Sequence, residues 1–298
     1  MAAPETDADE GSATLDVSRL TRILAGVVAP ATVLTGLLFF FGWSRATALF
    51  GVFGLNPTVL GLSTTDYLVG AQDGLFLPLA VVALLALVGS WCVTVLPGPF
   101  RRLLAQPWLP PLTVVVGVLL VAEGVLGLFG ASVLDGVAVA PLCLIAGVLL
   151  LAAVVRAKAP HRTVAERRAR AVELVAVFVV VALGLFWAVA DYSSAVGRQR
   201  ADEIVDGLGT SSSAVLYSAQ SLGIPADEVD VTVCTSADPA YRIRYAGLFL
   251  LLQAGDQYVF LPQSWTYDAG SAYVVPRSDA VRLDFRPADA ADAPLGAC

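Results

Sequence analysis

One carboxylate stands alone in an apolar stretch of this chain. Glu123 lies in VGVLLVAEGVLGLFG, residues 116–130, where every other side chain is uncharged. A charged carboxylate is costly in the middle of a bilayer, so such a residue bonds to a neighbouring helix, relays a proton or cation, or faces lipid by chance. No Lys, Arg or His lies in the apolar runs to pair with it. We expect Glu123 to be neutral and to donate a hydrogen bond between helices.

Two threonines lie at a similar predicted depth and could accept that bond, Thr32 and Thr35. Gly117, Gly124 and Gly127 flank the glutamate, and residues without side chains let a second helix approach closely. The expected role of Glu123 is therefore structural. A transport path lined by Glu123 and by residues 56–73 is the alternative.

The common catalytic and metal-binding motifs are absent. The single histidine, His161, lies in a basic segment outside residues 191–298, so no Ser-His-Asp triad can form there. The chain contains no GxxxxGK, HExxH or paired CxxC motif. We expect no enzyme activity, cofactor or metal; Asp66 and Asp73 would be the candidate acids of an enzyme, but neither has an evident base partner. Calcium is the alternative at two acidic groups that are also typical of solvated faces: Asp202, Glu203 and Asp206, and Asp227, Glu228 and Asp230.

Two of the four cysteines and two aromatic residues are further candidates. Cys234 and Cys298 lie in the polar C-terminal part, where a disulfide between them would remove about 3–4 kcal/mol of unfolded-state freedom; two free thiols are the alternative. Trp265 and Tyr267 lie in PQSWTYDAGS, a segment with the composition of a loop. We expect both aromatic side chains to be exposed and to contact a ligand or partner.

The composition is that of a membrane protein. Hydrophobic residues make up 57% of the 298 residues and charged residues only 14%, against about 25% in soluble domains. Five runs without Lys or Arg are long enough to cross a hydrocarbon core of about 30 Å. The predicted spans are residues 23–41, 75–96, 112–129, 137–155 and 174–190.

Basic residues indicate the orientation of these spans. Ten Lys and Arg residues fall on one side of a five-span chain, whereas the opposite short loops contain only Arg45. Cytoplasmic loops retain positive charge, so we expect a plasma-membrane protein with a cytoplasmic N-terminus, a disordered acidic tail over residues 1–22, and residues 191–298 outside. The basic segments lack the interleaved aromatics of a nucleic-acid surface, so the bilayer and a protein or envelope component are the expected partners.

Residues 42–74 form the first outer loop of this scheme. The segment is too apolar for a solvated linker, and Gly and Pro interrupt it too often for a span. Asn56 before Pro57 predicts a helix start, and Ser63 with Asp66 three residues later is the pattern of a capping box. We expect two short helices in the interface, with Asp73 near the end of the segment.

Residues 191–298 form a separate α+β domain by composition. This part holds seven of the eight tyrosines. A helix over residues 193–209 is followed by six strand candidates at 214–222, 229–234, 241–253, 257–262, 272–276 and 281–285, and AGDQ predicts a hairpin. The predicted fold is a five-helix transmembrane bundle, residues 23–190, with a small, mainly antiparallel sheet domain.

Three segments resemble multi-span membrane proteins of actinobacteria that have a C-terminal extracytoplasmic domain and no assigned activity. They are FFFGWSRATALFGVFGLNPTVLGLSTTDYL, YRIRYAGLFLLL and YVFLPQSW. The resemblance implies a membrane location and no catalytic residue. The expected function is partner binding or envelope sensing through the outer domain, with a transporter or channel component that uses Glu123 as the alternative.

Overall fold

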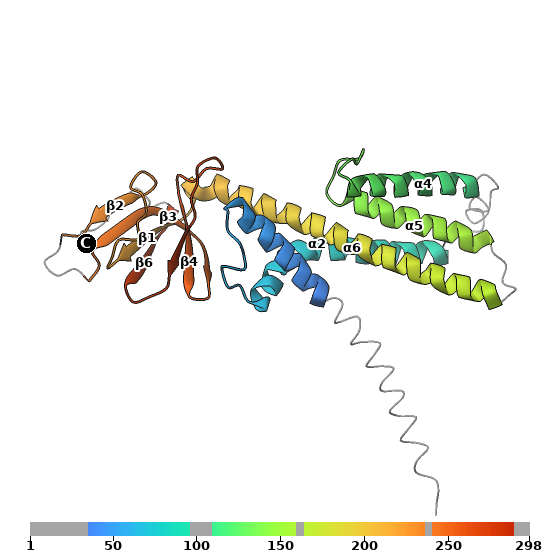
Figure 1. The fold of residues 1–298 in the computed structure, drawn as a ribbon, viewed down its shortest axis with the longest axis horizontal. Coiled ribbons are helices and arrows are strands. Elements are labelled where there is room, and N and C mark those ends of the chain that lie inside the picture. The colour runs from blue at the N-terminus through green and yellow to red at the C-terminus, as the bar shows by residue number, and fades with distance from the viewer. Residues whose placement is uncertain (1–34, 96–108, 159–163, 236–239, 289–298) are drawn as a thin grey trace, which may run out of the picture.

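Long helices and one sheet make up the protein (Figure 1). The structure is a computed structural model that describes residues 35–95, 109–158, 164–235 and 240–288. The first described helix covers Thr35–Val52. The others are α2 (Thr64–Val95), α4 (Leu109–Leu128), α5 (Val139–Lys158) and α6 (Val164–Gly207), and a 3-10 turn, η1 (Leu208–Thr210), follows α6.

The helix α6 joins the two ends of the molecule. Its 44 residues extend about 66 Å at 1.5 Å per residue, about twice the thickness of the hydrocarbon core of a bilayer. The first part of α6 packs beside α5, and the last part reaches the sheet (Figure 1). The predicted span 174–190 and residues 193–207 of the predicted helix 193–209 belong to this one helix, because the residues between them, Asp191 and Tyr192, do not break a helix; residues 208 and 209 belong to η1.

Four helices of the described residues are long and apolar enough to cross a membrane. They are Thr35–Val52, Pro111–Leu128, Val139–Arg156 and Arg170–Thr210. The last three contain most or all of the predicted spans 112–129, 137–155 and 174–190. Apolar side chains on these helices are exposed, as contact with lipid requires; Leu119, for example, is 64% exposed. The helices support a multi-pass membrane protein with a C-terminal sheet domain.

The other two predicted spans are described in part. Residues 75–95 are helical within α2, although α2 is not one of the four candidate spans. Residues 23–34 of the first predicted span and the predicted tail, residues 1–22, lie outside the described residues. The count of five spans therefore stays a prediction.

The prediction of two short interfacial helices in residues 42–74 is wrong. Residues 42–52 continue the first helix, and α2 already begins at Thr64, so only residues 53–63 are non-helical. Asn56 does not start a helix: its side-chain oxygen accepts hydrogen bonds from the backbone N–H and the hydroxyl of Thr58, as at a helix start, but the residues that follow form only a turn. Tertiary packing determines the conformation of residues 53–63, because Leu60 is only 2% exposed and packs in a hydrophobic core.

The helix Thr35–Val52 runs parallel to the middle of α6. The ring centroids of Phe40 and Phe186 lie 5.5 Å apart, and the hydroxyl oxygens of Ser44 and Ser194 lie 3.2 Å apart. Residue numbers rise together along both helices, which makes the pair parallel. Both helices therefore leave the apolar region in the same direction, toward the sheet.

Glycines allow α4 and α5 to pack closely, as predicted for Gly117, Gly124 and Gly127. A Cβ atom on Gly124 would lie 2.5 Å from the Cβ of Leu144, and one on Gly117 would lie 2.9 Å from the Cδ2 of Leu151. Atoms of real side chains do not approach so closely, so no other residue fits without separating the helices.

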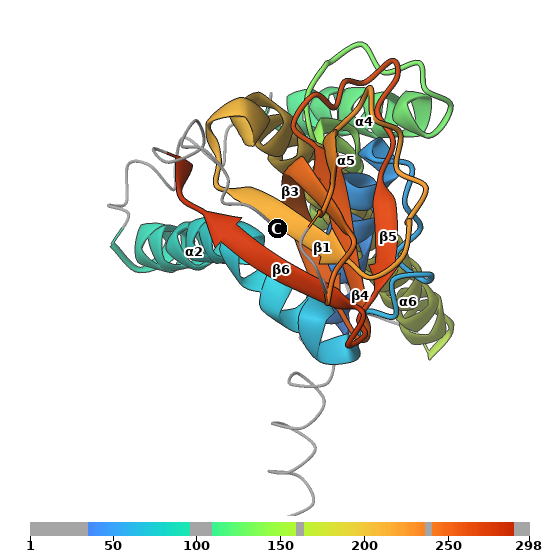
Figure 2. The ribbon, with the colours of Figure 1, turned by 90° about the vertical axis from the view of Figure 1, so that its left-hand side faces the viewer.

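The sheet domain has six strands, and every described strand pair is antiparallel. Strand order is β5-β4-β3-β1-β6, and β2 pairs with β3 beside this path (Figure 2). All six predicted strand segments and the AGDQ hairpin are confirmed, the last because Ala254 pairs with Gln257 across a two-residue turn. Gly255 in that turn has φ +52°, which favours glycine. The strands are β1 (Ser213–Ser218), β2 (Asp230–Val233), β3 (Ile243–Ala254), β4 (Gln257–Pro262), β5 (Tyr273–Pro276) and β6 (Val281–Arg286).

The strands β3 and β4 are apolar on both faces. On one face Leu248 and Phe260 pack with Ile224 in the core of the sheet domain. On the other face side chains of the same strands contact the helices and residues 53–63. This explains why LFLLL in β3 does not alternate between polar and apolar residues. We call the second contact the junction core: Phe50, Phe53, Leu60, Ala201, Leu208, Ala254, Val259, Leu261 and Trp265.

We predict that Gly124→Ala destabilises the protein and Gly89→Ala does not. The new methyl group at position 124 would collide with Leu144, and such overpacking costs about 1–3 kcal/mol. A Cβ atom on Gly89 of α2 meets nothing within 4 Å, and alanine has the higher helix propensity. Thermal unfolding of the purified protein in detergent measures both variants. Equal melting temperatures would show that α4 and α5 do not pack as described.

Candidate functional site

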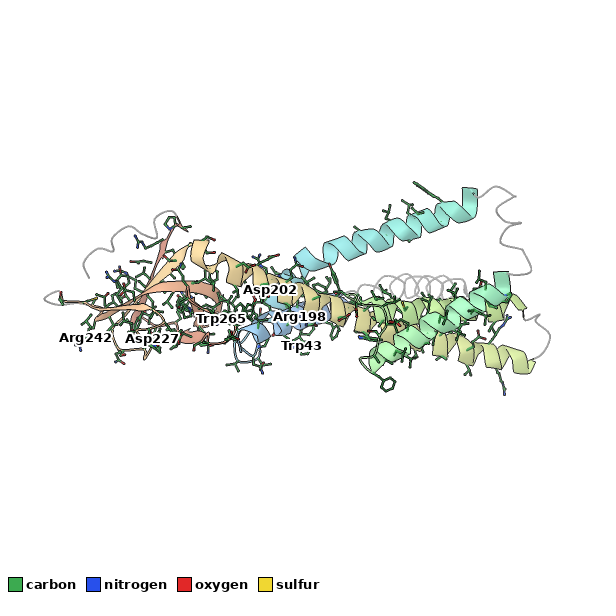
Figure 3. The ribbon with its side chains drawn as sticks, turned by 90° about the horizontal axis from the view of Figure 1, so that it is seen from above. Trp43, Arg198, Asp202, Asp227, Arg242 and Trp265 are labelled. Carbon is green, nitrogen blue, oxygen red and sulfur yellow. The ribbon has the colours of Figure 1, made fainter. Side chains whose placement is uncertain are left out.

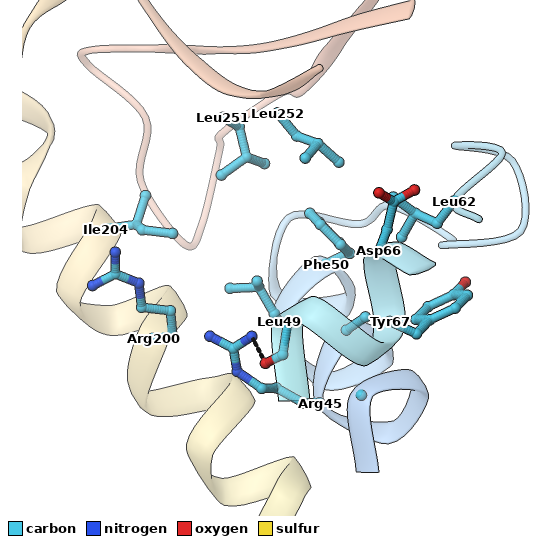
Figure 4. A pocket seen from close by; sticks show the side chains of 13 residues that line it. Arg45, Leu49, Phe50, Leu62, Asp66, Tyr67, Arg200, Ile204, Leu251 and Leu252 are labelled. Carbon is cyan, nitrogen blue, oxygen red and sulfur yellow. Dashed lines mark hydrogen bonds between the residues drawn. The ribbon is translucent and has the colours of Figure 1, made fainter. Parts of the chain in front are cut away.

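A cavity of about 280 Å³ lies between the helices and the sheet (Figure 4). Four segments line it: the helix Thr35–Val52 with residues 53–63, the start of α2, the last third of α6, and β3. The cavity therefore lies where the parallel helix pair meets the sheet domain. We refer to it as the junction cavity.

Two arginines and one aspartate give the cavity its charge. Arg45 comes from the first helix, Arg200 from α6 and Asp66 from α2. The Nη1 atom of Arg45 donates a hydrogen bond of 2.7 Å to the carbonyl of Gly70, which orients the guanidinium group (Figure 4). Arg200 also forms a 2.8 Å ion pair with Glu203, but both side chains of that pair are about half exposed, so the pair adds little stability.

Asp66 belongs to the capping box that the sequence predicts. Its Oδ2 atom accepts hydrogen bonds of 2.8 Å from the backbone N–H and from the hydroxyl of Ser63, and the Asp66 N–H donates to the Ser63 hydroxyl at 3.2 Å. These bonds, the hydroxyl first, lower the pKa of Asp66. The aspartate is thus an anion that fixes the start of α2, and the lining carries two positive charges against one negative charge.

The rest of the cavity wall is mainly apolar. Figure 4 shows that leucines of β3 face the helices across the cavity, opposite the side that carries the arginines. The wall therefore combines a cationic side with an aliphatic side. The larger apolar lining residues are Leu49, Phe50, Leu62, Ile204, Leu251 and Leu252.

The prediction that Trp265 is an exposed contact is wrong. Trp265 is 6% exposed, and its ring packs edge-on against Phe53, with centroids 5.1 Å apart. Figure 3 shows Trp265 at the boundary between the sheet and the helices. The residue lies in the junction core because residues 53–63 fold back over the sheet, which loop composition alone does not reveal.

Tyr267 is exposed as predicted, and it contacts α6. It is 59% exposed, and its hydroxyl donates a 2.6 Å hydrogen bond to Asp202. That bond is the main cause that raises the pKa of Tyr267 to about 12. Burial and a 2.6 Å hydrogen bond to Glu228 raise the pKa of Tyr273 to about 12 as well. Both tyrosines are therefore protonated donors at physiological pH.

These hydrogen bonds give a structural role to one residue of each acidic group, Asp202 and Glu228. Asp202 ties α6 to the segment after β4, and Glu228 ties the segment before β2 to β5. Across residues 35–95, 109–158, 164–235 and 240–288, no group of three or more His, Cys, Asp or Glu side chains is placed to hold a metal ion. The alternative of calcium at these groups gains no support from the described residues.

Glu123 bonds to a turn, and not to another helix as predicted. The residue is 8% exposed, and its carboxyl group accepts hydrogen bonds from the backbone N–H groups of Val133 (3.0 Å) and Leu134 (2.9 Å). Both residues belong to the turn between α4 and α5. Glu123 lies five residues before the end of α4 at Leu128, and its side chain reaches the turn that folds back over that end. The predicted donor role toward Thr35 is therefore wrong; Thr32 lies outside the described residues.

A second carboxylate completes the same turn. The Oδ2 atom of Asp191, on α6, accepts a 2.6 Å hydrogen bond from the backbone N–H of Ala138, just before α5 begins. Ala138 has φ +60°, a strained value for a residue other than glycine. Side chains from α4 and α6 thus supply acceptors to the backbone N–H groups of this turn.

Several predicted residues stay untested. Cys298 lies outside the described residues, so the disulfide with Cys234 stays a prediction. Asp73 lies in α2, and the structure describes its backbone but not its side chain. Asp66 lines the junction cavity, whereas Glu123 lies at the α4–α5 turn, so the described structure does not bring these two acids to one site.

Arg45, Arg200 and Asp191 are site residues that sequence reasoning missed. A signal existed for two of them: Arg45 is the only cation in residues 42–74, and Asp191 directly follows a predicted span. Arg200 carries no such signal, because it is one of several charged residues on an exposed helix face. Its place in the cavity depends on how the sheet sits on α6.

We predict that Glu123→Gln preserves stability and Glu123→Leu does not. Glutamine keeps an oxygen that can accept from Val133 and Leu134, whereas leucine removes both hydrogen bonds, each of which contributes about 0.5–1.5 kcal/mol. Melting temperatures in detergent and proteolysis of the 130–136 turn measure the difference. A Gln variant that folds like the native chain but loses function in cells would favour the proton relay instead.

Comparison of the chain with protein-family models, with curated proteins and with solved structures gives no match.

Proposed function

We propose that this is a plasma-membrane protein without enzyme activity that binds a protein or envelope component through its extracytoplasmic sheet domain. The observation that carries the proposal is the junction core. Through it, β3 and β4 pack against residues 53–63 and against α6, which continues into the apolar helices. Because the sheet domain packs directly against the helices, a change in the sheet on binding would alter its contacts with the helices. An envelope sensor requires such a connection.

The parallel helix pair supports the proposed orientation. If residues 23–41 and 174–190 cross the bilayer, both cross in the same direction, since the helix Thr35–Val52 and α6 are parallel. The basic residues that precede both spans then lie together on the cytoplasmic side, in accord with the positive-inside rule. The sheet follows both helices on the opposite side.

The contacts of Glu123 favour binding over transport. A relay group must exchange its proton with a path, whereas the described contacts of Glu123 are hydrogen bonds from backbone N–H groups of a turn. Such bonds fix the turn. The proposal therefore gives Glu123 a structural role and places recognition in the sheet domain.

The sheet domain presents an apolar side chain at its edge. Phe285 on β6 is 59% exposed, and β6 pairs only with β1 among the described strands. We predict that a photoreactive phenylalanine analogue at position 285 crosslinks a discrete protein or envelope component in intact cells. The matched control is Phe178 on α6, which is 70% exposed within a predicted span and should give lipid adducts only.

Mass spectrometry of the purified adducts identifies the products. A product specific to position 285 that copurifies with the protein supports the proposal. Products at 285 that are absent or the same as those at 178 contradict it.

The orientation has a separate test on α6. We predict that a membrane-impermeant maleimide labels Arg198→Cys in intact cells, but labels Arg168→Cys only after permeabilisation. Both positions are exposed, and about 45 Å of helix separates them. The unsubstituted protein provides the background from native cysteines. The reverse pattern would place the sheet domain in the cytoplasm.

A further inference from the structure

The strand β6 forms an open edge of the sheet. It lies beside β1 at the end of the strand order, and no other described strand pairs with it. Its register with β1 is continuous from Val281 to Arg286, without a bulge. At the opposite edge, β5 has only four residues and ends in Pro276, and proline is one of the features that keep an edge strand from pairing. The edge at β6 is thus the longer and more regular one, as pairing with a further strand requires.

The backbone of β6 presents hydrogen-bonding groups to its open side. The N–H of Ala219 donates to the carbonyl of Ala280 at 2.9 Å, at the start of the β1–β6 ladder. Along an antiparallel strand, the residues whose backbone groups point toward the neighbouring strand alternate. Even-numbered residues of β6 therefore bond toward β1, and the N–H and C=O groups of Leu283 and Phe285 point to the open side. Val281 adds only its C=O there, because its N–H donates within the preceding turn.

A second copy of β6 matches this edge in one register. Antiparallel pairing about a two-fold axis perpendicular to the sheet leaves every side chain on its own face, so even-numbered residues lie opposite even-numbered residues. With Leu283 opposite its own copy, Arg282 of each chain lies opposite Asp284 of the other. If Arg282 or Asp284 were at the centre instead, that charge would lie opposite its own copy, which is unfavourable. The charges of β6 therefore select the register centred on Leu283.

The same register pairs apolar residues with apolar residues. Val281 and Leu283 pack against the core of the sheet domain, whereas Phe285 on the same face is 59% exposed. In the pair, Phe285 lies opposite Val281 of the second copy, and an aromatic residue opposite a β-branched one is a favourable cross-strand pair. On the other face, Arg282 and Asp284 form a 2.7 Å ion pair within one chain. Pairing joins two such ion pairs into a network of four alternating charges.

The direction of the two-fold axis allows both copies to lie in one membrane. The helices extend along the longest axis of the molecule in Figure 1, and Figure 2, which looks along that axis, shows the broad side of β6. An axis perpendicular to the sheet at β6 therefore runs roughly along the helices. Rotation about such an axis keeps the helices of both copies pointing in the same direction, as spans of one bilayer require.

We propose that β6 pairs with β6 of a second copy of this chain, so that the two sheets become continuous across a two-fold axis at Leu283. This inference rests on the proposed function, because it names the protein component at Phe285 as a second copy. Residues 289–298 of the same chain are the competing occupant of the edge. Their sequence, DAADAPLGAC, contains no β-branched or aromatic residue, so its strand propensity is low.

Photocrosslinking in membranes tests the pairing. A single strand edge is a small interface, and confinement in a membrane raises the effective concentration of the second copy. Two differently tagged full-length chains, each with the phenylalanine analogue at position 285, are therefore coexpressed and irradiated. We expect a covalent product of twice the chain mass that carries both tags. Its attachment point should be Val281 of the other copy or a residue next to it.

Charge reversal separates pairing between chains from the ion pair within one chain. Arg282→Asp and Asp284→Arg each place like charges opposite one another twice in a dimer, so each alone should reduce the covalent dimer at least about fivefold. Coexpression of the two variants should restore it, because the aspartates of one chain then face the arginines of the other. Neither chain regains its own ion pair in this mixture. Recovery therefore reports only the contact between copies.

Arg198→Asp is the matched control, because it makes the same change of charge at an exposed position of α6 (Figure 3). It should leave the yield of covalent dimer unchanged. The chain with both substitutions, Arg282→Asp and Asp284→Arg, should dimerise with its own copies, which tests the register even where a single variant folds poorly. Melting temperatures in detergent show which variants fold.

Two results of the charge variants would overturn the proposal. Single variants that crosslink like the native chain would show that these charges do not meet across the edge. Folded variants whose mixture gives no recovery, together with a doubly substituted chain that does not dimerise, would show the same.

The product at position 285 distinguishes this proposal from the proposed function. Attachment to residues 289–298 of the same chain would make the C-terminal segment the occupant of the edge and overturn the pairing. A product with a different protein or envelope component would also overturn the pairing, but it would support the proposed function. The absence of any product specific to position 285 would contradict both.

Discussion

Two-sided burial of β3 and β4 is the constraint on which the architecture depends. On one face of these strands, Leu248 and Phe260 pack in the core of the sheet domain. On the opposite face, Leu261 and Val259 are also apolar and are buried by other segments. Residues 53–63 and the end of α6 provide that cover. A small sheet that left this face in water would expose apolar surface prone to association. The sheet and the helices are therefore one unit, and the junction cavity lies in the contact between them.

A second constraint acts at the turn between α4 and α5. Backbone N–H groups of a turn have no partner within a helix or sheet, so other groups must accept their hydrogen bonds. Glu123 and Asp191 supply acceptors to Val133, Leu134 and Ala138 from two different helices. The isolated glutamate is thus explained by the polar backbone next to it. The same bonds connect α4, α5 and α6 at a single level.

Elements that depend on local pattern were predictable, and contacts between distant segments were not. The strands of residues 213–286 and the AGDQ hairpin follow from β-rich runs separated by turn residues, and the Ser63–Asp66 capping box follows from spacing. Glu123 was assigned the wrong partner because depth along one helix does not show that the following turn folds back. Trp265 was assigned to the surface because its cover, Phe53, comes from a segment about two hundred residues earlier.

The length of α6 sets a distance as well as a connection. If the bilayer ends near Ala190, the rest of α6, up to Gly207, is a helical segment about 25 Å long between the bilayer and the sheet. The sheet then lies at the far end of this segment, away from the lipid surface. A binding partner of the sheet must therefore extend about 25 Å from the bilayer surface. Molecules confined to the headgroup layer can reach the start of this segment of α6 but not the outer edge of the sheet.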